Sequence, residues 1–169
     1  KRIAMSAWGT ANMRTGGDDI AQALALMGVQ PQWDKQANRV TGFEVMPLTV
    51  LGRPRVDVVF RISGFFRDAF PTQVDLLDSA VRAVSEQDEA EYDNPLAAQT
   101  QKDRAAFVAA GASAEEASRR AGFRVFGSKP GAYGAGLQTL IDEKCWETDE
   151  DLSKAYVAWG GYAYGDGAE

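Results

Sequence analysis

The segment Ser63-Gly64-Phe65-Phe66-Arg67-Asp68 combines side chains that could bind a flat molecule carrying carboxylates. The planar guanidinium of Arg67 can hold a carboxylate through two parallel hydrogen bonds. Phe65 and Phe66 could present an apolar wall, and Asp68 could accept a proton or hold Arg67 in place. The same residues also fit a structural role, with both phenylalanines in the core and Arg67 in a local ion pair with Asp68.

A second candidate segment is WGTANMRTGGDD, from Trp8 to Asp19. Its glycines and the helix start at Thr15 could bind an anion such as a carboxylate. The glycine spacing matches neither a P-loop nor the dinucleotide-binding fingerprint. The alternative is an ordinary turn from a strand into a helix, capped by Thr15.

A third candidate is the glycine-rich segment GSKPGAYGAGLQ, from Gly127 to Gln138. Glycine lets the backbone approach a ligand closely, and Lys129 and Tyr133 are the possible ligand contacts. A flexible loop before a helix would have the same composition.

The chain has no histidine and a single cysteine, Cys145. Any metal site built from these residues would use carboxylates, amides or that thiol, whereas cobalt and similar ions favour imidazole or thiolate. We therefore predict no metal site within this segment. We expect Cys145 to be a packed residue beside Trp146.

The elements that would position these segments alternate between strand and helix. This alternation predicts an α/β layered fold with a mostly parallel sheet flanked by helices. Ligands bind beyond the carboxyl ends of such strands, so the three candidate segments should meet there. The acidic stretch 86–93 is expected to be exposed, and the aromatic tail 160–169 is expected to dock on the core or on a neighbouring domain. Strands are predicted at 3–8, 39–45, 56–62 and 123–126, a loop at 11–17, and helices at 20–27, 72–85, 96–110, 113–121, 138–143 and 149–159.

Composition narrows the function classes. The 169 residues suit one domain or a piece of a larger one, and 45% are hydrophobic. A net charge of −6 argues against nucleic-acid partners and anionic membrane surfaces. We find no membrane span or signal peptide, and one cysteine suits a reducing cytoplasm. The chain starts at Lys1 and soon enters an apolar run, which predicts a cut from a longer polypeptide, although processing would give the same start.

Three long stretches together resemble one family: Trp8–Asp34, Val40–Val81 and Arg124–Gly165. They resemble the large subunits of aerobic cobaltochelatases, the CobN family. The H subunits of magnesium chelatases show a looser form of the same pattern. The sequence Gly-Ala-Tyr-Gly-Ala-Gly and the ending Trp-Gly-Gly-Tyr-Ala-Tyr-Gly look closer to the cobalt branch.

The resemblance implies that residues 1–169 are a single α/β segment cut from a much larger chelatase subunit. That subunit would bind hydrogenobyrinic acid a,c-diamide for ATP-dependent cobalt insertion in cobalamin biosynthesis, with cobalt as the substrate ion. AAA+ ATPase partner subunits would use the ATP, which would not be bound here. The remainder of the parent chain would be a further partner, and the fragment alone is expected to be inactive.

Tetrapyrrole chemistry suggests a role for each candidate residue. A flat ring needs an apolar wall, its peripheral carboxylates need cationic or N–H partners, and metal entry needs a base for the ring N–H protons. We predict carboxylate contacts at Arg67 and Thr15, a ring wall of Phe65, Phe66 and Tyr133, and a base or transient metal ligand at Asp68 or Glu44.

Two other functions remain open for this segment. It could be a non-catalytic scaffold that docks the ATPase partners or other domains, or an independent α/β small-molecule-binding domain. If it lines the chelatase site, Arg67, Asp68 and Tyr133 should converge on a shared pocket. A scaffold should bury them in separate ion pairs and core contacts.

Overall fold

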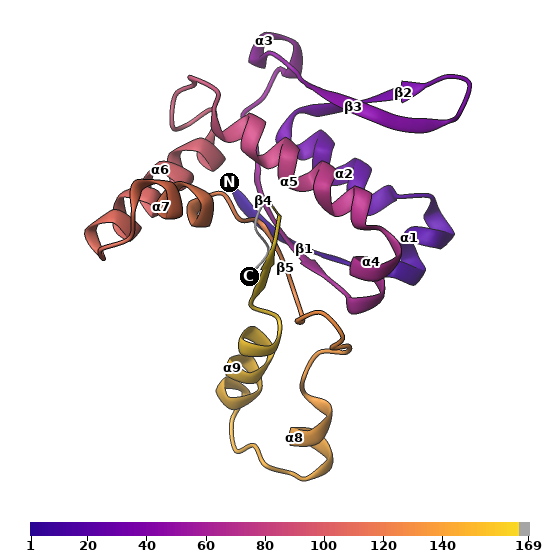
Figure 1. Ribbon diagram of the computed structural model, residues 1–169, viewed down its shortest axis with the longest axis vertical. Helices are drawn as coiled ribbons and strands as arrows, with labels where there is room; N and C mark the ends of the chain where they lie inside the picture. The colour runs from indigo at the N-terminus through magenta and orange to yellow at the C-terminus, as the bar shows by residue number, and fades with distance from the viewer. Residues whose placement is uncertain (166–169) are drawn as a thin grey trace.

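The computed structural model describes residues 1–165, and a four-stranded sheet forms its centre (Figure 1). The strand order is β1 (Arg2–Ala7), β4 (Asp57–Ile62), β5 (Val125–Gly127) and β6 (Tyr162–Tyr164). The first three strands run parallel, and β6 is antiparallel to β5. The predicted mostly parallel α/β sheet is therefore confirmed.

One face of the sheet carries the core. Val58, Phe60 and Ile62 alternate along β4 and are almost completely buried. They lie in one buried apolar cluster with side chains of α2 (Asp18–Met27) and α5 (Pro71–Ser85), and these two helices cover this face of the sheet (Figure 1). Every second residue of β4 and the apolar faces of α2 and α5 thus pack together in one hydrophobic core.

The opposite face of the sheet is less completely covered. Ser6 of β1 is exposed, and Val59 and Arg61 of β4 are only half-buried. The helices α6 (Pro95–Ala109) and α7 (Ala114–Ala121) pack on each other and lie to one side of the strands (Figure 1). Parallel sheets are usually covered on both faces, so this face resembles a surface prepared for a further layer.

The connection from β1 to β4 contains a hairpin of β2 (Val29–Asp34) and β3 (Arg39–Val45), which forms its own antiparallel sheet. The strand β3 was predicted, but β2 was not. Its sequence, VQPQWD, contains a proline and two glutamines, and it lacks the β-branched run that marks a strand. A short helix, α3 (Leu48–Leu51), follows the hairpin.

The predicted loop at 11–17 is wrong, because α1 (Gly9–Thr15) occupies most of it. Polar residues suggested a loop, yet Asn12 is buried and its side-chain amide donates to Gln73 of α5 at 2.9 Å. A tertiary contact therefore stabilises a helix that the local sequence does not predict. The break comes at Gly16 and Gly17, both with positive φ.

Between β5 and β6 the chain leaves the sheet as an arm, which comprises α8 (Gln138–Asp142) and α9 (Asp149–Trp159) (Figure 1). Neither helix has a buried residue, and Cys145 between them is exposed, so the prediction of a packed cysteine is wrong. The chain returns as β6, which confirms docking of the aromatic tail as far as 165; the rest of that prediction, 166–169, lies outside the described residues. No helix in residues 1–165 is long and apolar enough to cross a membrane.

A buried arginine ties the connections to one another. Arg55 is 1% exposed and forms two hydrogen bonds with the carboxylate of Glu89, at 2.7 and 2.8 Å. Its other N–H groups donate to the carbonyls of Met27, Gly28 and Met46. The acidic stretch 86–93 was predicted to be exposed. This prediction is wrong at Glu89, whose side chain is largely buried because it pairs with the guanidinium of Arg55.

Candidate functional site

The site begins at Ser63, directly after β4. Its hydroxyl oxygen accepts the backbone N–H of Gly9 at 3.2 Å and that of Phe66 at 3.1 Å. Gly9 opens α1, and Phe66 lies in the first turn of α4 (Gly64–Ala69). One side chain therefore caps two helices and fixes both at the carboxyl edge of the parallel strands.

We expect Ser63→Ala to lower the free energy of unfolding by about 1–3 kcal/mol, because it leaves two backbone N–H groups without an acceptor. Ser113→Ala is the matched control, since Ser113 caps only the N–H of Glu116 at the exposed start of α7. That variant should lose about 0.5–1 kcal/mol. Urea unfolding followed by tryptophan fluorescence measures both. Equal losses would contradict a double cap at Ser63.

The third candidate segment meets the same edge. A Cβ on Gly64 would lie 2.7 Å from the carbonyl oxygen of Ala132 and 2.7 Å from the Tyr133 ring, so the absence of a side chain permits this contact. Similarly, a Cβ on Gly9 would lie 2.5 Å from the ring of Phe65. The prediction that the three segments meet at the carboxyl edge of the strands is confirmed.

Arg67 holds the third segment in place. Its Nε and Nη2 donate to the two carboxylate oxygens of Asp68 at 2.6 and 2.9 Å. Its Nη1 donates to the carbonyls of Ser128, Lys129 and Ala132, at 2.8–3.2 Å. The side chain is only 8% exposed. A guanidinium has five N–H groups, so at most one, on Nη2, stays available for the carboxylate contact predicted for Arg67.

The three polar residues of the site share one network of charges. Asp68 accepts from Arg67 and also from the Tyr133 hydroxyl at 2.7 Å. These hydrogen bonds, that from Arg67 above all, lower the pKa of Asp68. The same carboxylate raises the pKa of Arg67 and that of Tyr133. At neutral pH the network is therefore an ionised carboxylate, a guanidinium cation and a protonated phenol.

This network gives Asp68 a specific chemical character. The lowered pKa makes Asp68 a weaker base than an ordinary aspartate. Its side chain nevertheless is 44% exposed, so its oxygens remain accessible to an approaching cation or proton donor. Arg67, Asp68 and Tyr133 come together in one hydrogen-bonded network, but none of them lines either of the two cavities described below, so their convergence on a shared pocket stays a prediction.

The predicted ring wall is only partly present. Phe65 and Tyr133 are 41% and 60% exposed at the strand edge. Phe66 is completely buried in the core and stacks at a tilt against Phe70, with ring centroids 5.4 Å apart. The prediction of a ring contact is therefore wrong for Phe66, because neighbouring helical residues point in different directions and the second phenylalanine faces the interior.

Two further predicted residues are not brought to the network. Glu44 lies on β3, in the hairpin that Figure 1 shows away from α4, the helix that carries Asp68, so it does not share a site with Asp68. Thr15 ends α1, where its hydroxyl donates to the carbonyl of Ala11 and accepts from the N–H of Asp18. With its only proton in use, Thr15 acts as the turn cap of the alternative interpretation rather than as an anion ligand.

Sequence reasoning missed three residues beside the network. Trp8, Arg61 and Tyr156 help to line a cavity of about 40 Å³, together with Ser6, Ile62, Ser63 and residues 134–135. A signal existed for two of them: Trp8 follows the last residue of β1, and Arg61 alternates with core residues of β4. Tyr156 comes from α9, and no spacing in the sequence links it to the strands.

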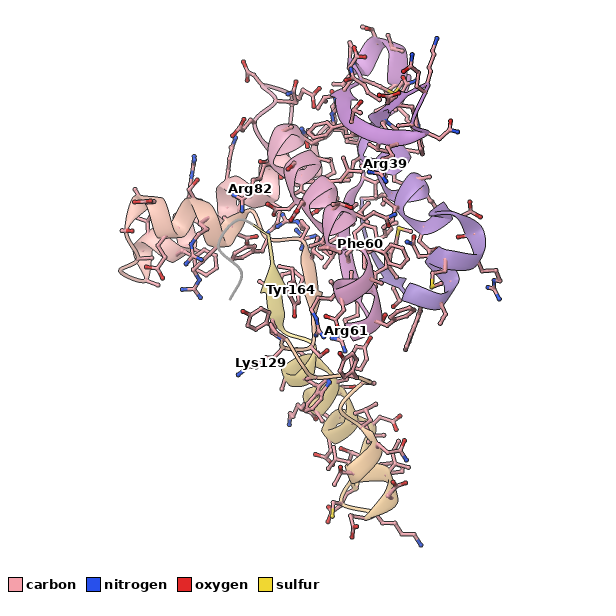
Figure 2. All side chains as sticks on the ribbon, turned by 45° about the vertical axis from the view of Figure 1, so that its right-hand side comes forward. Arg39, Phe60, Arg61, Arg82, Lys129 and Tyr164 are labelled. Carbon is pink, nitrogen blue, oxygen red and sulfur yellow. The ribbon has the colours of Figure 1, made fainter. Side chains whose placement is uncertain are left out.

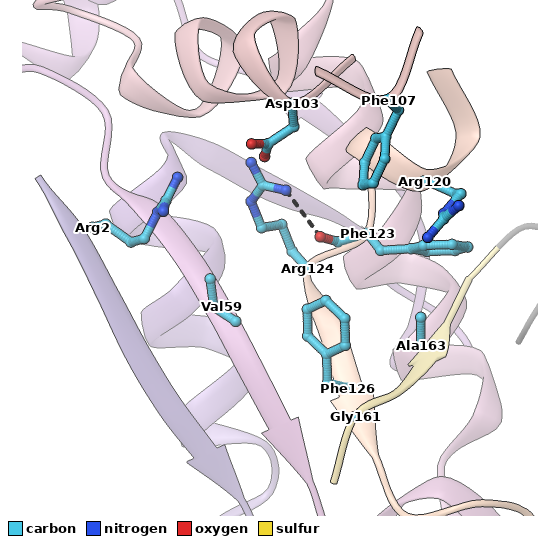
Figure 3. A pocket seen from close by; sticks show the side chains of 10 residues that line it. All are labelled: Arg2, Val59, Asp103, Phe107, Arg120, Phe123, Arg124, Phe126, Gly161 and Ala163. Carbon is cyan, nitrogen blue, oxygen red and sulfur yellow. Dashed lines mark hydrogen bonds between the residues drawn. The ribbon is translucent and has the colours of Figure 1, made fainter. Parts of the chain in front are cut away.

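A larger hollow of about 480 Å³ lies on the open face of the sheet (Figure 3). None of the predicted residues lines it, and its cations already have partners. Arg124 donates to Asp57 and to the carbonyls of Ala121 and Phe123. We interpret it as a packing groove rather than the site. Its side-chain lining includes Arg2, Arg120, Arg124, Asp103, Phe107, Phe123 and Phe126.

Within residues 1–165, no three histidine, cysteine, aspartate or glutamate side chains lie close enough together to hold a metal ion. The acidic group that is exposed at the strand edge is Asp68, and it is paired with Arg67. On its own, this segment therefore offers a single carboxylate to a passing cation at the network.

Comparison with known families gives a match along the whole chain. The family model described as CobN/Magnesium Chelatase matches residues 1–169. The aerobic cobaltochelatase subunit CobN of Sinorhizobium sp. is 63% identical over 168 residues, which are 99% of this chain and 13% of that protein. The H subunit of the magnesium chelatase of Rhodobacter capsulatus is 39% identical over 166 residues, 98% of this chain and 13% of that protein.

A solved structure agrees with these relatives. The catalytic subunit of cobaltochelatase from Mycobacterium tuberculosis has a TM-score of 0.87 and 53% sequence identity. The match covers 97% of this chain and 13% of that one. The chain thus spans about one eighth of the length of the relatives it matches, and its identity is higher to the cobalt enzymes than to the magnesium enzyme.

Proposed function

Because the chain belongs to the CobN/magnesium chelatase family, we propose that it forms part of the tetrapyrrole-binding large subunit of a cobaltochelatase. The subunit inserts Co²⁺, its substrate ion, into hydrogenobyrinic acid a,c-diamide. AAA+ partner subunits hydrolyse ATP to drive the insertion, and the reaction takes place in the cytoplasm. We expect the 169-residue chain alone to insert no cobalt.

The strand edge carries the observation that favours this function. Exposed rings of Trp8, Phe65 and Tyr133 stand there beside the ionised carboxylate of Asp68. Aromatic faces stack on flat macrocycles, and rings left in water gain by being covered. The Gly9–Phe65 and Gly64–Tyr133 contacts hold two of these rings against the scaffold before a ligand arrives.

In this proposal each residue of the network has a distinct task. Entry of Co²⁺ releases the ring N–H protons, and Asp68 acts as the first proton acceptor or as a transient cobalt ligand. Its low pKa keeps it ionised, which favours attraction of the cation over retention of the proton. Arg67 positions both Asp68 and the segment that bears Tyr133, and its remaining Nη2 N–H is the one left for a ligand carboxylate.

Titration of the large subunit that carries this sequence tests the proposal. Hydrogenobyrinic acid a,c-diamide should bind saturably without ATP or cobalt and should quench tryptophan fluorescence. Phe65→Ala should weaken that binding, whereas Val108→Ala, an exposed apolar residue on α6, should not. A subunit that folds and still fails to bind the tetrapyrrole would overturn the proposal.

A second function has its own observation. The arm exposes large apolar side chains, among them Trp146 and Val157, and one face of the sheet is open. These surfaces favour a scaffold that docks ATPase partners or other parts of the subunit. In that case Phe65→Ala leaves tetrapyrrole binding intact, whereas Val157→Asp abolishes ATPase-dependent cobalt insertion without changing the tetrapyrrole Kd.

A further inference from the structure

Arg61 differs from the other arginines that reach the interior. Its guanidinium lies over the ring of Tyr156, with Cζ 4.7 Å from the ring centroid. Its Nη1 is buried and has no hydrogen-bond partner within residues 1–165. By contrast, five other arginines, some buried and some partly exposed, each have a carboxylate oxygen at 2.6–2.8 Å: Arg2, Arg55, Arg67, Arg82 and Arg124. Nη2 of Arg82 is also buried without a hydrogen-bond partner within residues 1–165, but Arg82 has its carboxylate in Asp78.

A buried N–H group without an acceptor is unfavourable, because it has lost water and gained no hydrogen bond in exchange. The ring of Tyr156 compensates only in part, since a cation–π contact leaves the N–H groups unpaired. The fold nevertheless accommodates this cation closely: a Cβ on Gly160 would overlap the guanidinium, so glycine there is what admits it. Figure 2 shows Arg61 where the sheet meets the arm.

A cavity that Arg61 helps to line could admit a hydrogen-bond acceptor to its guanidinium. Its volume of about 40 Å³ exceeds the roughly 10–15 Å³ that a single water needs but is far below the roughly 300 Å³ of small-molecule pockets. It therefore accepts one small group of a ligand and not a ring. The lining adds hydroxyl groups from Ser6 and Ser63 and the flat side chain of Trp8, which is half-exposed.

We propose that this cavity is a subsite for one peripheral carboxylate of the tetrapyrrole, held by Arg61 and flanked by the Trp8 ring. The inference rests on the proposed function. A carboxylate arm enters the cavity and pairs with the guanidinium fork, and the macrocycle stays outside against the exposed aromatic residues. Arg61 therefore takes the carboxylate-binding role that Arg67, with its donors occupied, can fill only in small part.

The test uses the large subunit that carries this segment and two ligands, hydrogenobyrinic acid a,c-diamide and its peripheral methyl ester. Arg61→Met should raise the Kd of the acid roughly 10- to 100-fold and leave that of the ester within about two-fold. Gly160→Ala keeps the charge of Arg61 but displaces its guanidinium. This variant should therefore also raise the Kd of the acid and not that of the ester. Arg39→Met, on the exposed start of β3, is the control and should change neither Kd.

Each other outcome has one meaning. If Arg61→Met binds the acid as tightly as the parent subunit does, the subsite is refuted. If it weakens acid and ester equally and lowers the Tm of the ligand-free subunit, Arg61 pairs with a carboxylate of the polypeptide, which also refutes it. If the parent subunit binds neither ligand, the proposed function itself has failed, and that result is distinct from both.

Discussion

Replacing Arg55 with methionine is expected to destabilise the protein by about 3–5 kcal/mol, the typical cost of breaking a buried ion pair. The substitution removes the two hydrogen bonds that Glu89 accepts from Arg55, and it removes the guanidinium donors from the carbonyls of Met27, Gly28 and Met46. It also removes the side chain that hydrogen-bonds to the end of α2, to the end of the hairpin and to the α5–α6 connection. Urea unfolding of the chain measures the loss.

Arg2→Met is the matched control, because Arg2 also pairs with a buried carboxylate, Asp57, yet is half-exposed itself. Asp57 keeps Arg124 as a partner, so this variant should lose about 0–1 kcal/mol. If both variants lose a similar free energy of unfolding, burial of the Arg55–Glu89 pair does not increase its contribution to stability.

The Arg55 pair also predicts a pH dependence. The hydrogen bonds from Arg55 lower the pKa of Glu89. A carboxylate with a lowered pKa in the folded state contributes stability above its ordinary pKa of about 4.3, and that contribution is lost as the pH falls further. The difference in the free energy of unfolding between the parent and Arg55→Met should therefore have its largest value near neutral pH and shrink below about pH 4. A difference that stays constant down to acid unfolding would contradict the ion pair.

Replacing Arg67 with methionine is expected to have the largest effect on function. The variant should lose tetrapyrrole affinity roughly 100-fold, because Asp68 and the 128–133 backbone lose the group that orders them. Amide hydrogen exchange should quicken in 128–136 and stay slow in β4. Arg67→Lys should recover little, since one ammonium group cannot span the carboxylate and three carbonyls.

Tyr133→Phe separates the Arg67 network from the aromatic wall. It removes only the hydroxyl that donates to Asp68 and keeps the exposed ring. Affinity should therefore fall by less than about tenfold. If Arg67→Met leaves both exchange and affinity unchanged, Arg67 does not organise the site.

The fold could be predicted wherever local pattern and tertiary environment agree. The β-branched run of β4 and the apolar face of α5 are examples, and both are confirmed. Prediction from the local sequence pattern failed for elements that depend on contacts with residues distant in the sequence. Asn12 stabilises α1 through Gln73, and β2 exists because β3 pairs with it, so neither element shows in its own residues.

The same limit applies to the site. The meeting of three segments at the strand edge followed from topology alone, and Arg67, Asp68 and Tyr133 share one hydrogen-bonded network there. Which of Phe65 and Phe66 faces outward depends on the angle at which α4 leaves β4. Whether Nη1 of Arg61 finds a partner within residues 1–165 depends on where the carboxylates of that part lie, and a single sequence does not display that.

The arm has an evolutionary consequence. It leaves the sheet at Gly127 and returns at Tyr162, and these two residues are direct neighbours in the ladder of β5 and β6. A segment whose ends already adjoin can lengthen or shorten at little entropic cost to the rest of the fold. Tyr156 on this arm nonetheless forms part of the cavity around Arg61. Selection could therefore alter ligand preference through the arm while the core that folds the protein stays unchanged.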